Sequence, residues 1–404
     1  MRIGIIGAGA AGMAAALAAS ESSGAQVLLL ERQARVGRKL AATGNGRCNL
    51  SNIHAGEGGY HGDDPDFSRY AIDQFGPEET LRWFRSLGLF TVTEDSGKVY
   101  PYSDQANSVV DVLRFALDRP NIELITDFEV IRFRKTEQGF LLESKDKKVA
   151  CDRVIVACGG LAGTRLGGTM AGYKLLRSMG HKCTKLRPAL VQVKTGWSGV
   201  SALKGVRANC HAAIYHNGKL HRESEGEIQF TEFGLSGPVI YEISRDACQG
   251  SGDWECTMNF LPGMTPDVLR QELVRRRATS LNAEDLLTGI LHNRLGRVIV
   301  QNAGIRGRTP ASELTDYELN EITELAKTFT VDLTEPLGMD AAQVTAGGIV
   351  TEEFDPTTME SRLVPGLYAC GEVLDVDGDC GGYNLQWAWS SGRLAGYSAG
   401  KESE

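Results

Sequence analysis

Hydrophobic positions at the start of the chain follow a strand, turn, helix and strand pattern. A short apolar segment covers Arg2 to Ile6, and a glycine turn over 7–12 separates it from the alanine-rich segment Met13 to Ser20. The continuous apolar run Val27 to Leu30 then has the pattern of a strand buried on both faces of a sheet. These elements within about 30 residues predict a βαβ unit with parallel strands.

The same alternation of helices and strands continues to about residue 188. We predict helices over 77–87 and 108–117, and strands over 122–125, 129–134, 140–144 and 153–157. After residue 188 the alternation of polar and apolar positions becomes typical of antiparallel strands, which we expect over 190–193, 211–215 and 227–230. From residue 266 the periodicity is helical, with helices expected over 267–276 and 316–329.

The α/β pattern returns at the end of the chain, with a strand expected over 366–370 and a helix over 385–395. The economical interpretation is one dinucleotide-binding domain built from both ends of the chain. A β insertion interrupts it, and that insertion carries a helical insertion of its own. A chain of 404 residues is also too long for one ordinary hydrophobic core.

Charge and cysteine content exclude several classes of protein. The net charge of −8 argues against nucleic acid as a partner, and the basic run 275–277 is interpreted as the solvated face of a helix. Nine cysteines without a C-x-x-C pair argue against a disulfide framework, a zinc site and a thioredoxin-like pair, and they favour the cytoplasm. The first twenty residues imitate a signal peptide, but their glycines interrupt the apolar run. No stretch approaches the ~18–20 apolar residues of a membrane span, so no membrane partner is expected.

The first motif with chemical meaning is the turn Gly7-Ala8-Gly9-Ala10-Ala11-Gly12, which follows a strand and opens a helix. Glu31 ends the next strand, about 20 residues further on, which completes the dinucleotide-binding fingerprint. The first glycine permits the tight turn, the second lets the backbone approach a pyrophosphate, and the third lets the helix pack on the sheet. The helix start attracts the phosphates, and Glu31 accepts hydrogen bonds from a ribose. The alternative is a glycine-rich turn that binds no cofactor, with Glu31 as an ordinary surface residue.

Two further segments are rich in small residues. The stretch Arg35 to Asn52 has too few apolar residues for ordinary core, so its small residues can lie beside a ring system, with Arg47 and Asn49 as donors. A flexible loop is the alternative for this stretch. The strand over 153–157 ends in Cys158-Gly159-Gly160, where a second approach of the backbone to a cofactor can occur.

The segment Gly366 to Gly396 contains the fourth motif. A strand ends at Gly371-Glu372, an Asp-rich and Gly-rich turn follows, and Gly381-Gly382-Tyr383-Asn384 leads into a helix. Glu372 can hold ribityl hydroxyls, and the helix start can face the pyrimidine edge of a flavin, which becomes negative on reduction. Asp375, Asp377 and Asp379 have a rival interpretation as a calcium loop, but no acid stands at the twelfth position. We therefore predict FAD and no metal.

Together these segments resemble the BaiN/YhiN-like family of FAD-dependent oxidoreductases. The matching stretches are GAGAAG, GRKLAATGNGRCNLSN, GEIQFTEFGLSGPVI, TAGGIV and GEVLDVDGDCGGYNLQWAWSSGRLAG. The family commonly has Gly at Asn45 and Thr or Ser at Cys158. The resemblance implies an α/β fold with a Rossmann-type FAD-binding domain (1–188 and 346–404), an inserted β-barrel-like domain (189–262 and 328–345) and a helical subdomain (263–327).

The motifs and the resemblance together predict which residues bind FAD non-covalently. They are Gly7, Gly9, Ala10, Ala11, Gly12, Glu31, Arg32, Lys39, Thr43, Gly44, Asn45, Gly46, Arg47, Cys48, Asn49, Val130, Ala157, Gly159, Gly160, Gly371, Glu372, Gly381, Gly382, Tyr383, Asn384, Leu385 and Gln386.

The expected reaction is hydride exchange between the flavin and a small or medium organic substrate, an enone or steroid-like compound or an amine. There is no second GxGxxG with a following acid, so NAD(P)H is expected only as a transient donor at the flavin. Arg47, Tyr100 and Tyr383 are candidate polar groups near the reacting carbon. Aromatic packing in a loop is the favoured explanation for Tyr100, whereas helix capping or core packing explains His181 as well as catalysis does. No catalytic residue and no oligomeric state is assigned. The alternative function is a non-catalytic FAD-binding sensor or scaffold.

Overall fold

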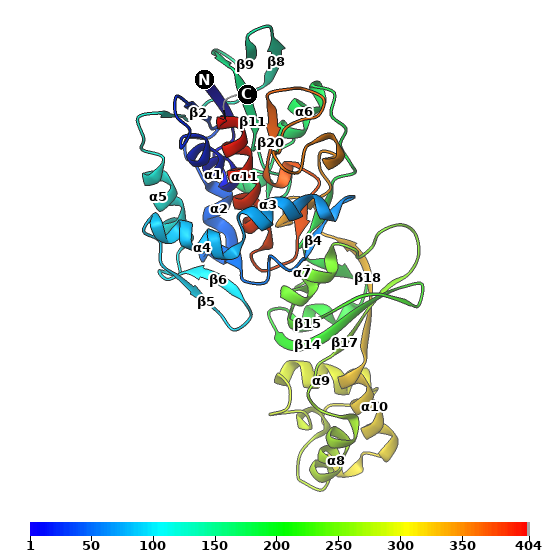
Figure 1. Cartoon of the computed structure of the whole chain (residues 1–404). Coiled ribbons are helices and arrows are strands. Elements are labelled where there is room, and N and C mark those ends of the chain that lie inside the picture. Colours follow the sequence, from blue (N-terminus) through cyan, green and yellow to red (C-terminus); the bar gives the residue numbers. More distant parts are fainter. Residues whose placement is uncertain (402–404) are drawn as a thin grey trace. The chain divides into compact units, whose positions relative to one another are not determined.

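The computed structural model describes residues 1–401 and divides into two compact units. The first unit contains Met1–Arg187 and Gln343–Glu404, and the second contains Pro188–Ala342 (Figure 1). The first unit is therefore built from two distant parts of the sequence. The finer division into three domains, with the helical segment 263–327 as one of them, stays a prediction.

The centre of the first unit is a five-stranded sheet in which every pair of neighbours is parallel. Its order is β20 (Leu367–Ala369), β11 (Arg153–Val156), β1 (Arg2–Ile6), β2 (Gln26–Leu30) and β7 (Ile122–Ile125). The central strands are apolar along their length because helices cover them, and Ile3 and Ile5 are fully buried. The predicted α/β fold with a parallel sheet is confirmed.

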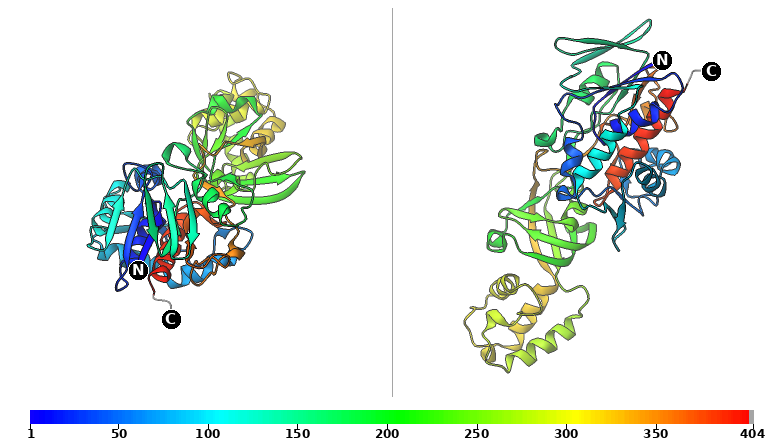
Figure 2. Two further views of the ribbon diagram at one scale, coloured as in Figure 1. Left: turned by 90° about the horizontal axis from the view of Figure 1, so that it is seen from above. Right: turned by 90° about the vertical axis from the view of Figure 1, so that its left-hand side faces the viewer.

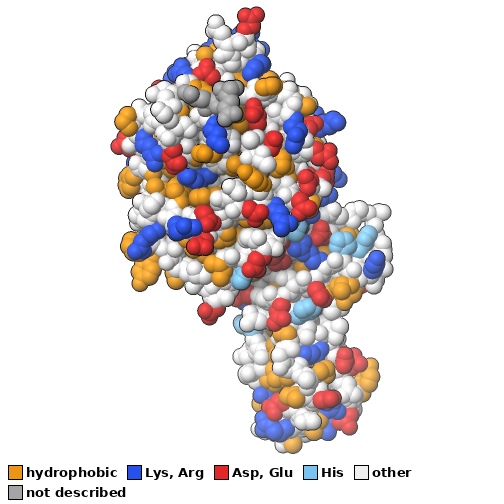
Figure 3. All heavy atoms as spheres, in the orientation of Figure 1, with side chains coloured by type: hydrophobic (Ala, Val, Ile, Leu, Met, Phe, Trp, Pro, Cys, Tyr) orange, Lys and Arg blue, Asp and Glu red, His pale blue; other side chains and the backbone are white. Residues whose placement is uncertain are grey.

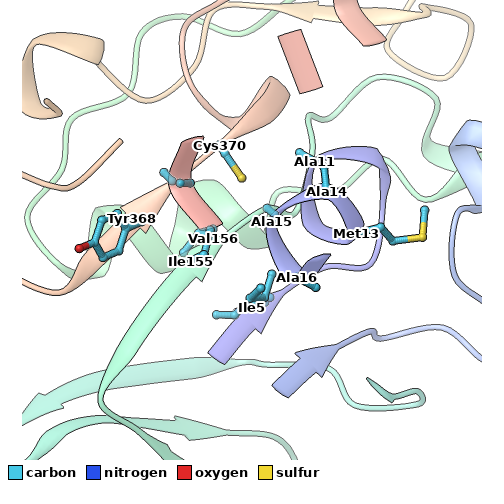
Figure 4. Packing of buried hydrophobic residues seen from close by; sticks show 14 of the residues in the cluster. Ile5, Ala11, Met13, Ala14, Ala15, Ala16, Ile155, Val156, Tyr368 and Cys370 are labelled. Carbon is cyan, nitrogen blue, oxygen red and sulfur yellow. The ribbon is translucent and has the colours of Figure 1, made fainter. Parts of the chain in front are cut away.

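Two helices from opposite ends of the chain pack against each other in this unit. They are α1 (Ala10–Ala19) and α11 (Tyr383–Gly400), and they lie side by side in the right-hand view of Figure 2. A Cβ on Gly392 or Gly396 would overlap a carbonyl oxygen of α1, so the helix backbones approach closely through small residues. Figure 4 shows alanines of α1 gathered with Ile5 of β1 and with Cys370, which follows β20.

Smaller elements surround the sheet. The helices are α2 (Arg38–Ala42), α3 (Arg69–Gln74), α4 (Pro77–Ser86), α5 (Ala106–Ala116) and α6 (Ala171–Ser178). Three short sheets are formed by β3 (Ser51–Asn52), β6 (Lys98–Pro101) and β5 (Thr91–Thr93); by β4 (Tyr60–His61) and β21 (Asp377–Gly378); and by β8 (Arg132–Thr136), β9 (Gly139–Glu143) and β10 (Lys148–Cys151). The strand expected over 129–134 thus starts three residues later.

The second unit contains a closed six-stranded barrel, which confirms the expected barrel-like insertion. Its strands in order are β13 (Val193–Thr195), β16 (Gly234–Ser236), β15 (Lys219–Phe230), β14 (Arg207–His216), β17 (Trp254–Asn259) and β18 (Phe329–Pro336). The helices of the unit are α7 (Pro238–Ser244), α8 (Pro266–Arg277), α9 (Asn293–Asn302) and α10 (Asp316–Lys327). The barrel and its helices share one hydrophobic core. Short strands β12 (Arg187–Ala189) and β19 (Val344–Ala346) lie where the chain leaves and re-enters the first unit.

Two boundaries in the second unit differ from the sequence prediction. The expected strand over 190–193 begins only at Val193, because Leu190 has a positive φ of 49° that interrupts an extended conformation. The expected helix over 316–329 ends at Lys327, and Phe329 begins strand β18 instead. Phe329 is buried in the core of the unit, so packing overrides the helical periodicity there.

Candidate functional site

The glycines of the first turn have three different environments. Gly7 has a positive φ of 104°, and a Cβ there would lie 2.6 Å from the carbonyl oxygen of Ala157. A Cβ on Gly12 would overlap the carbonyl oxygen of Gly7, whereas a Cβ on Gly9 would meet nothing within 4 Å. Gly9 also precedes the first turn of α1, and no side chain caps that helix start. An open backbone beside free helix N–H groups fits a pyrophosphate.

Glu31 lies immediately after β2 and is held against the first turn. One carboxylate oxygen accepts the backbone N–H of Ala8 at 2.9 Å, and the other accepts the N–H of Gln33 at 2.9 Å. The neighbouring Arg32 donates to the carbonyl oxygen of Gly167 at 2.8 Å. These bonds fix the Glu31 carboxylate at the end of the strand, where the fingerprint needs an acceptor for a ribose.

A second group of predicted residues meets around Glu372. Its carboxylate pairs with the Lys39 ammonium at 2.7 Å and accepts the backbone N–H of Thr345 at 2.9 Å. A Cβ on Gly160 would overlap the same carboxylate, while Gly159 faces open space with a φ of 69°. Helix α2, the end of β11 and the end of β20 therefore converge here, although Lys39 and Glu372 are 333 positions apart.

The loop Thr43–Asn49 is held in an unusual backbone conformation. Gly44, Asn45 and Cys48 all have positive φ values, of 57°, 56° and 62°. Asparagine is one of the few residues with a side chain that adopts this conformation readily, so Asn45 can stand where the family commonly has glycine. The side-chain oxygen of Asn49 is buried and has no hydrogen-bond partner within residues 1–401. A buried acceptor without a partner fits a donor supplied by a bound group.

The structure brings Arg47 and Tyr100 together, as the sequence could only suggest. The Arg47 guanidinium lies 4.1 Å from the centre of the Tyr100 ring. It also pairs with Asp104 at 2.5 Å and Glu94 at 3.2 Å. Burial raises the pKa of Tyr100 above its usual value, with Glu94 adding to the rise and Arg47 opposing it. Tyr100 is therefore a neutral hydrogen-bond donor beside a fixed cation.

The turn before α11 is packed against protein. Gly381 and Gly382 have φ values of 112° and 109°, and a Cβ on Gly382 would overlap the carbonyl oxygen of Ser51. The Asn384 side chain closes the turn, since it accepts the N–H of Gly378 at 2.8 Å and donates to its carbonyl at 2.7 Å. Tyr383 packs edge-on against Tyr60, with ring centres 6.0 Å apart.

Some predicted site residues lie inside the protein. The Gln386 side chain is fully buried and bonds to Ser51, Phe75, Thr80 and Ser390, so its side chain holds the start of α11 in place. Cys48, Val130 and Ala157 are also buried, which leaves few of their atoms for a ligand. His181 is a core residue: its ring stacks on Phe354 and bonds to Glu353 and Ser361 at 2.9 Å each. His181 is thus explained by packing.

One polar cluster at the site escaped the sequence reasoning. His61 lies 2.7 Å from Asp379, two residues before Gly381. The signal in the sequence was weak: a Tyr-His pair between glycines, with no periodic pattern. Among residues 1–401, no group of three or more His, Cys, Asp or Glu side chains is arranged to hold a metal ion.

Comparison with known proteins agrees with this geometry. The family model described as "HI0933-like protein Rossmann domain" matches residues 1–398. The 3-dehydro-bile acid delta(4,6)-reductase of Clostridium scindens is 41% identical over 404 residues, covering 98% of each chain. The ribosomal RNA dihydrouridine synthase of Escherichia coli is 33% identical over 393 residues, covering 96% of this chain and 95% of the relative.

A solved structure supports the fold alone. The 3-ketosteroid delta1-dehydrogenase of Sterolibacterium denitrificans matches 98% of this chain and 99% of its own, with a TM-score of 0.52 and 13% identity. Within residues 1–401, no helix is both long enough and apolar enough to span a bilayer.

Proposed function

Since the chain belongs to the HI0933-like Rossmann family and is an FAD-dependent oxidoreductase, we propose that it reduces a C=C bond conjugated with a carbonyl group in a small organic molecule. The observation that carries this proposal is shared chemistry among its relatives. A delta(4,6)-reductase of a 3-dehydro-bile acid and a dihydrouridine synthase are both named for adding hydrogen across such a bond. The resemblance seen in the sequence is confirmed, whereas the substrate class is our inference.

FAD supplies hydride chemistry when bound, and we propose that the two glycine turns and the polar groups between them hold it. The turn over 7–12 and the start of α1 bind the pyrophosphate, with Gly9 as the open position. Glu31 accepts from the adenosine ribose, and the Lys39–Glu372 pair lies where the ribityl chain needs polar partners. Asn49 offers its unpartnered oxygen to a ring N–H.

The remaining predicted contacts follow from these positions. We propose that four further residues line the same FAD site through backbone atoms or, for Arg32, the aliphatic part of the side chain: Arg32, Gly159, Gly160 and Gly371. The buried Val130 and Ala157 contribute only a few atoms. The residues of the loop 43–49 cover the ring, and Gly381 to Leu385 present backbone at the start of α11. Gln386 supports this helix start from inside the protein.

Arg47, Tyr100 and Tyr383 are the groups that we propose orient the substrate. A carbonyl conjugated with the reacting C=C bond gains negative charge as hydride arrives, so a nearby cation and a neutral phenol lower the barrier. Arg47 is held over Tyr100 by two carboxylates, so the pair keeps its geometry without the substrate. NAD(P)H is the proposed transient donor of the hydride, since the sequence carries one dinucleotide fingerprint.

A small-molecule substrate is favoured over RNA by charge. The chain carries a net charge of −8, whereas nucleic-acid surfaces are rich in Lys and Arg. On the face drawn in Figure 3, acidic and basic side chains are interspersed and no continuous basic patch is visible. The reduced state of nine scattered cysteines supports a cytoplasmic location.

Anaerobic stopped-flow measurements on the FAD-loaded protein test the proposal. NADH or NADPH should bleach the flavin, and a 4,6-dien-3-one steroid or a simple cyclic enone should restore its colour, with a saturated ketone as the control. An amine substrate would instead bleach the oxidised flavin directly. A uridine-containing rRNA fragment that restores colour faster than any enone would overturn the small-molecule assignment. Flavin that responds to none of these would favour the sensor or scaffold alternative.

A further inference from the structure

A two-residue ladder places a histidine beside the turn that precedes α11. Strand β4 pairs antiparallel with β21, which sets His61 opposite Asp377 and Tyr60 opposite Gly378. The two strands come from parts of the chain more than 300 positions apart. The backbone of Asp379 continues the pairing, because its N–H donates to the carbonyl oxygen of Gly59 at 2.9 Å. The position of His61 is therefore fixed by the fold.

His61 and Asp379 form a close, half-shielded pair. The ring Nε2 lies 2.7 Å from one carboxylate oxygen, and the two side chains are 25% and 27% exposed. A carboxylate bonded to one ring nitrogen orients the imidazole and leaves the other nitrogen for a further partner. A more exposed His–carboxylate pair lies nearby in the sequence, His54 with Glu57 at 3.3 Å, whose side chains are 51% and 75% exposed. That pair has no such shielding.

Two tyrosine side chains, Tyr60 and Tyr383, lie beside this pair. The Tyr60 hydroxyl donates to the carbonyl oxygen of Tyr383 at 3.4 Å, and its ring packs edge-on against that of Tyr383. Burial raises the pKa of Tyr60 far above its usual value, so this phenol keeps its proton. A Cβ on Gly59 would lie 2.7 Å from the Tyr383 ring and 2.9 Å from the second oxygen of Asp379. His61 is thus held by Asp379 within this cluster and remains partly exposed.

We infer that His61, oriented by Asp379, is the acid that completes the proposed reduction. The inference rests on the proposed function, because a conjugated C=C bond needs a proton as well as a hydride. As the π bond breaks, the carbon β to the carbonyl takes the hydride and its two electrons from reduced FAD. The α carbon takes the proton of the His61 imidazolium. The flavin is oxidised, the substrate is reduced, and the imidazole regains its proton from water.

Two substitutions separate proton transfer from electron transfer. His61→Gln keeps a side chain that can bond to Asp379 but cannot deliver a proton, and Asp379→Asn removes the orienting charge. With photoreduced protein, His61→Gln should slow flavin reoxidation by a 4,6-dien-3-one steroid by about 10²- to 10⁴-fold, the usual contribution of a general acid. The reoxidation rate of Asp379→Asn should lie between those of His61→Gln and wild type. Reoxidation by ferricyanide, which takes electrons without a proton, should be unchanged in both.

His54→Gln is the matched control, since it removes the exposed histidine of the His54–Glu57 pair and should behave like wild type. Rescue adds a readout that a structural role would not give. In His61→Ala, added imidazoles should restore steroid reduction, and substituted imidazoles should do so in the order of their acidity. Bound FAD is quantified for every variant, so that cofactor loss is not mistaken for loss of the acid.

A measurement independent of turnover completes the test. Ring ¹⁵N chemical shifts of His61 in the oxidised protein should report a hydrogen bond at Nε2, and this signature should change in Asp379→Asn but not in His54→Gln. Wild-type protein that is inert to the steroid and to simple enones, yet reacts with ferricyanide, would overturn the proposed function and this inference together. Wild-type protein that reduces the steroid while His61→Gln does so equally fast would overturn the inference alone.

Discussion

The two glycine turns of the first unit look alike in sequence but differ in what their glycines meet. In the turn over 7–12, Gly9 faces open space while its neighbours Gly7 and Gly12 are packed against backbone. In the turn before α11, a Cβ on Gly381 would lie 3.0 Å from the Lys98 side chain, and one on Gly382 would overlap the backbone of Ser51. The first turn thus combines two packed positions with an open one, which we propose for the cofactor. In the second turn, protein atoms already occupy the space that a side chain would need.

This difference teaches that a glycine motif does not by itself point toward a ligand. The second turn can still present its backbone N–H groups to a flavin, but a substituent on Gly382 would strain the fold before it reached any cofactor. Any effect of the α11 start on the reduction potential of the flavin must therefore be tested with substitutions at positions other than Gly382. The comparison yields four predictions, in which stability and cofactor affinity separate.

The largest effect is expected for Gly12→Val. Its side chain would overlap the Gly7 carbonyl, and backbone cannot move aside as a flexible side chain can. We expect a loss of about 3 kcal/mol or more in the free energy of unfolding, with loss of FAD as a consequence. Urea unfolding of the apoprotein measures it. Apoprotein that is as stable as wild type would show that the helix does not pack on the turn in this way.

Gly382→Ala should follow, with a loss of about 1–3 kcal/mol. Alanine at a φ of 109° is strained, and its methyl group meets the Ser51 carbonyl. The same urea titration applies, and Gly180→Ala, which has a similar φ of 98° but open space around it, separates strain from overlap. Equal losses in the two variants would mean that the contact with Ser51 contributes nothing.

Gly9→Val should have the opposite effect to Gly12→Val: it should weaken FAD binding while leaving the stability of the apoprotein nearly unchanged. The backbone of Gly9 is extended, with φ −82° and ψ −166°, which a valine adopts readily, and the space around it is open. Apoprotein stability should stay within about 0.5 kcal/mol of wild type. FAD affinity should fall by more than about tenfold, equivalent to about 1.4 kcal/mol, because the side chain fills the pyrophosphate position. Fluorescence titration of apoprotein with FAD gives the affinity, and unchanged binding would refute the assignment of this turn.

The smallest effect is expected for Glu31→Gln. The amide retains one acceptor, so one of the bonds to Ala8 and Gln33 is lost and the other weakens. Charged acceptors contribute about 1 kcal/mol more than neutral ones, so FAD affinity should fall about fivefold. Isothermal titration against FAD measures this. If Glu31→Gln loses more FAD affinity than Gly9→Val does, then our assignment of Gly9 to the pyrophosphate is wrong.

The sequence predicted the elements whose signal is local. The strands at 2–6, 27–30 and 153–157 are continuous apolar runs, and the fingerprint ending in Glu31 has fixed spacing, so these were found with little error. The short helices α3 and α7 were not predicted, and neither was the change from helix to strand before Phe329. In that last case burial in the barrel core decided the conformation.

The parts of the site that escaped prediction depend on distant pairing. Strands β4 and β21 have two residues each, too short for any periodicity, and their pairing joins segments far apart in the chain. The convergence of Lys39 on Glu372 and the burial of Gln386 have the same origin. The unpartnered oxygen of Asn49 is visible only once its surroundings are folded.

The close packing of α1 on α11 also has a consequence for how the protein is made. The ribosome releases α1 long before its partner surface around Gly392 and Gly396 is synthesised. Until then the alanines of α1 and one side of the proposed cofactor site are not covered by α11. Contacts of such long sequence separation form slowly. We therefore expect FAD loading to be post-translational: ribosome-stalled chains that stop before residue 383 should not retain FAD, and chains that include α11 should.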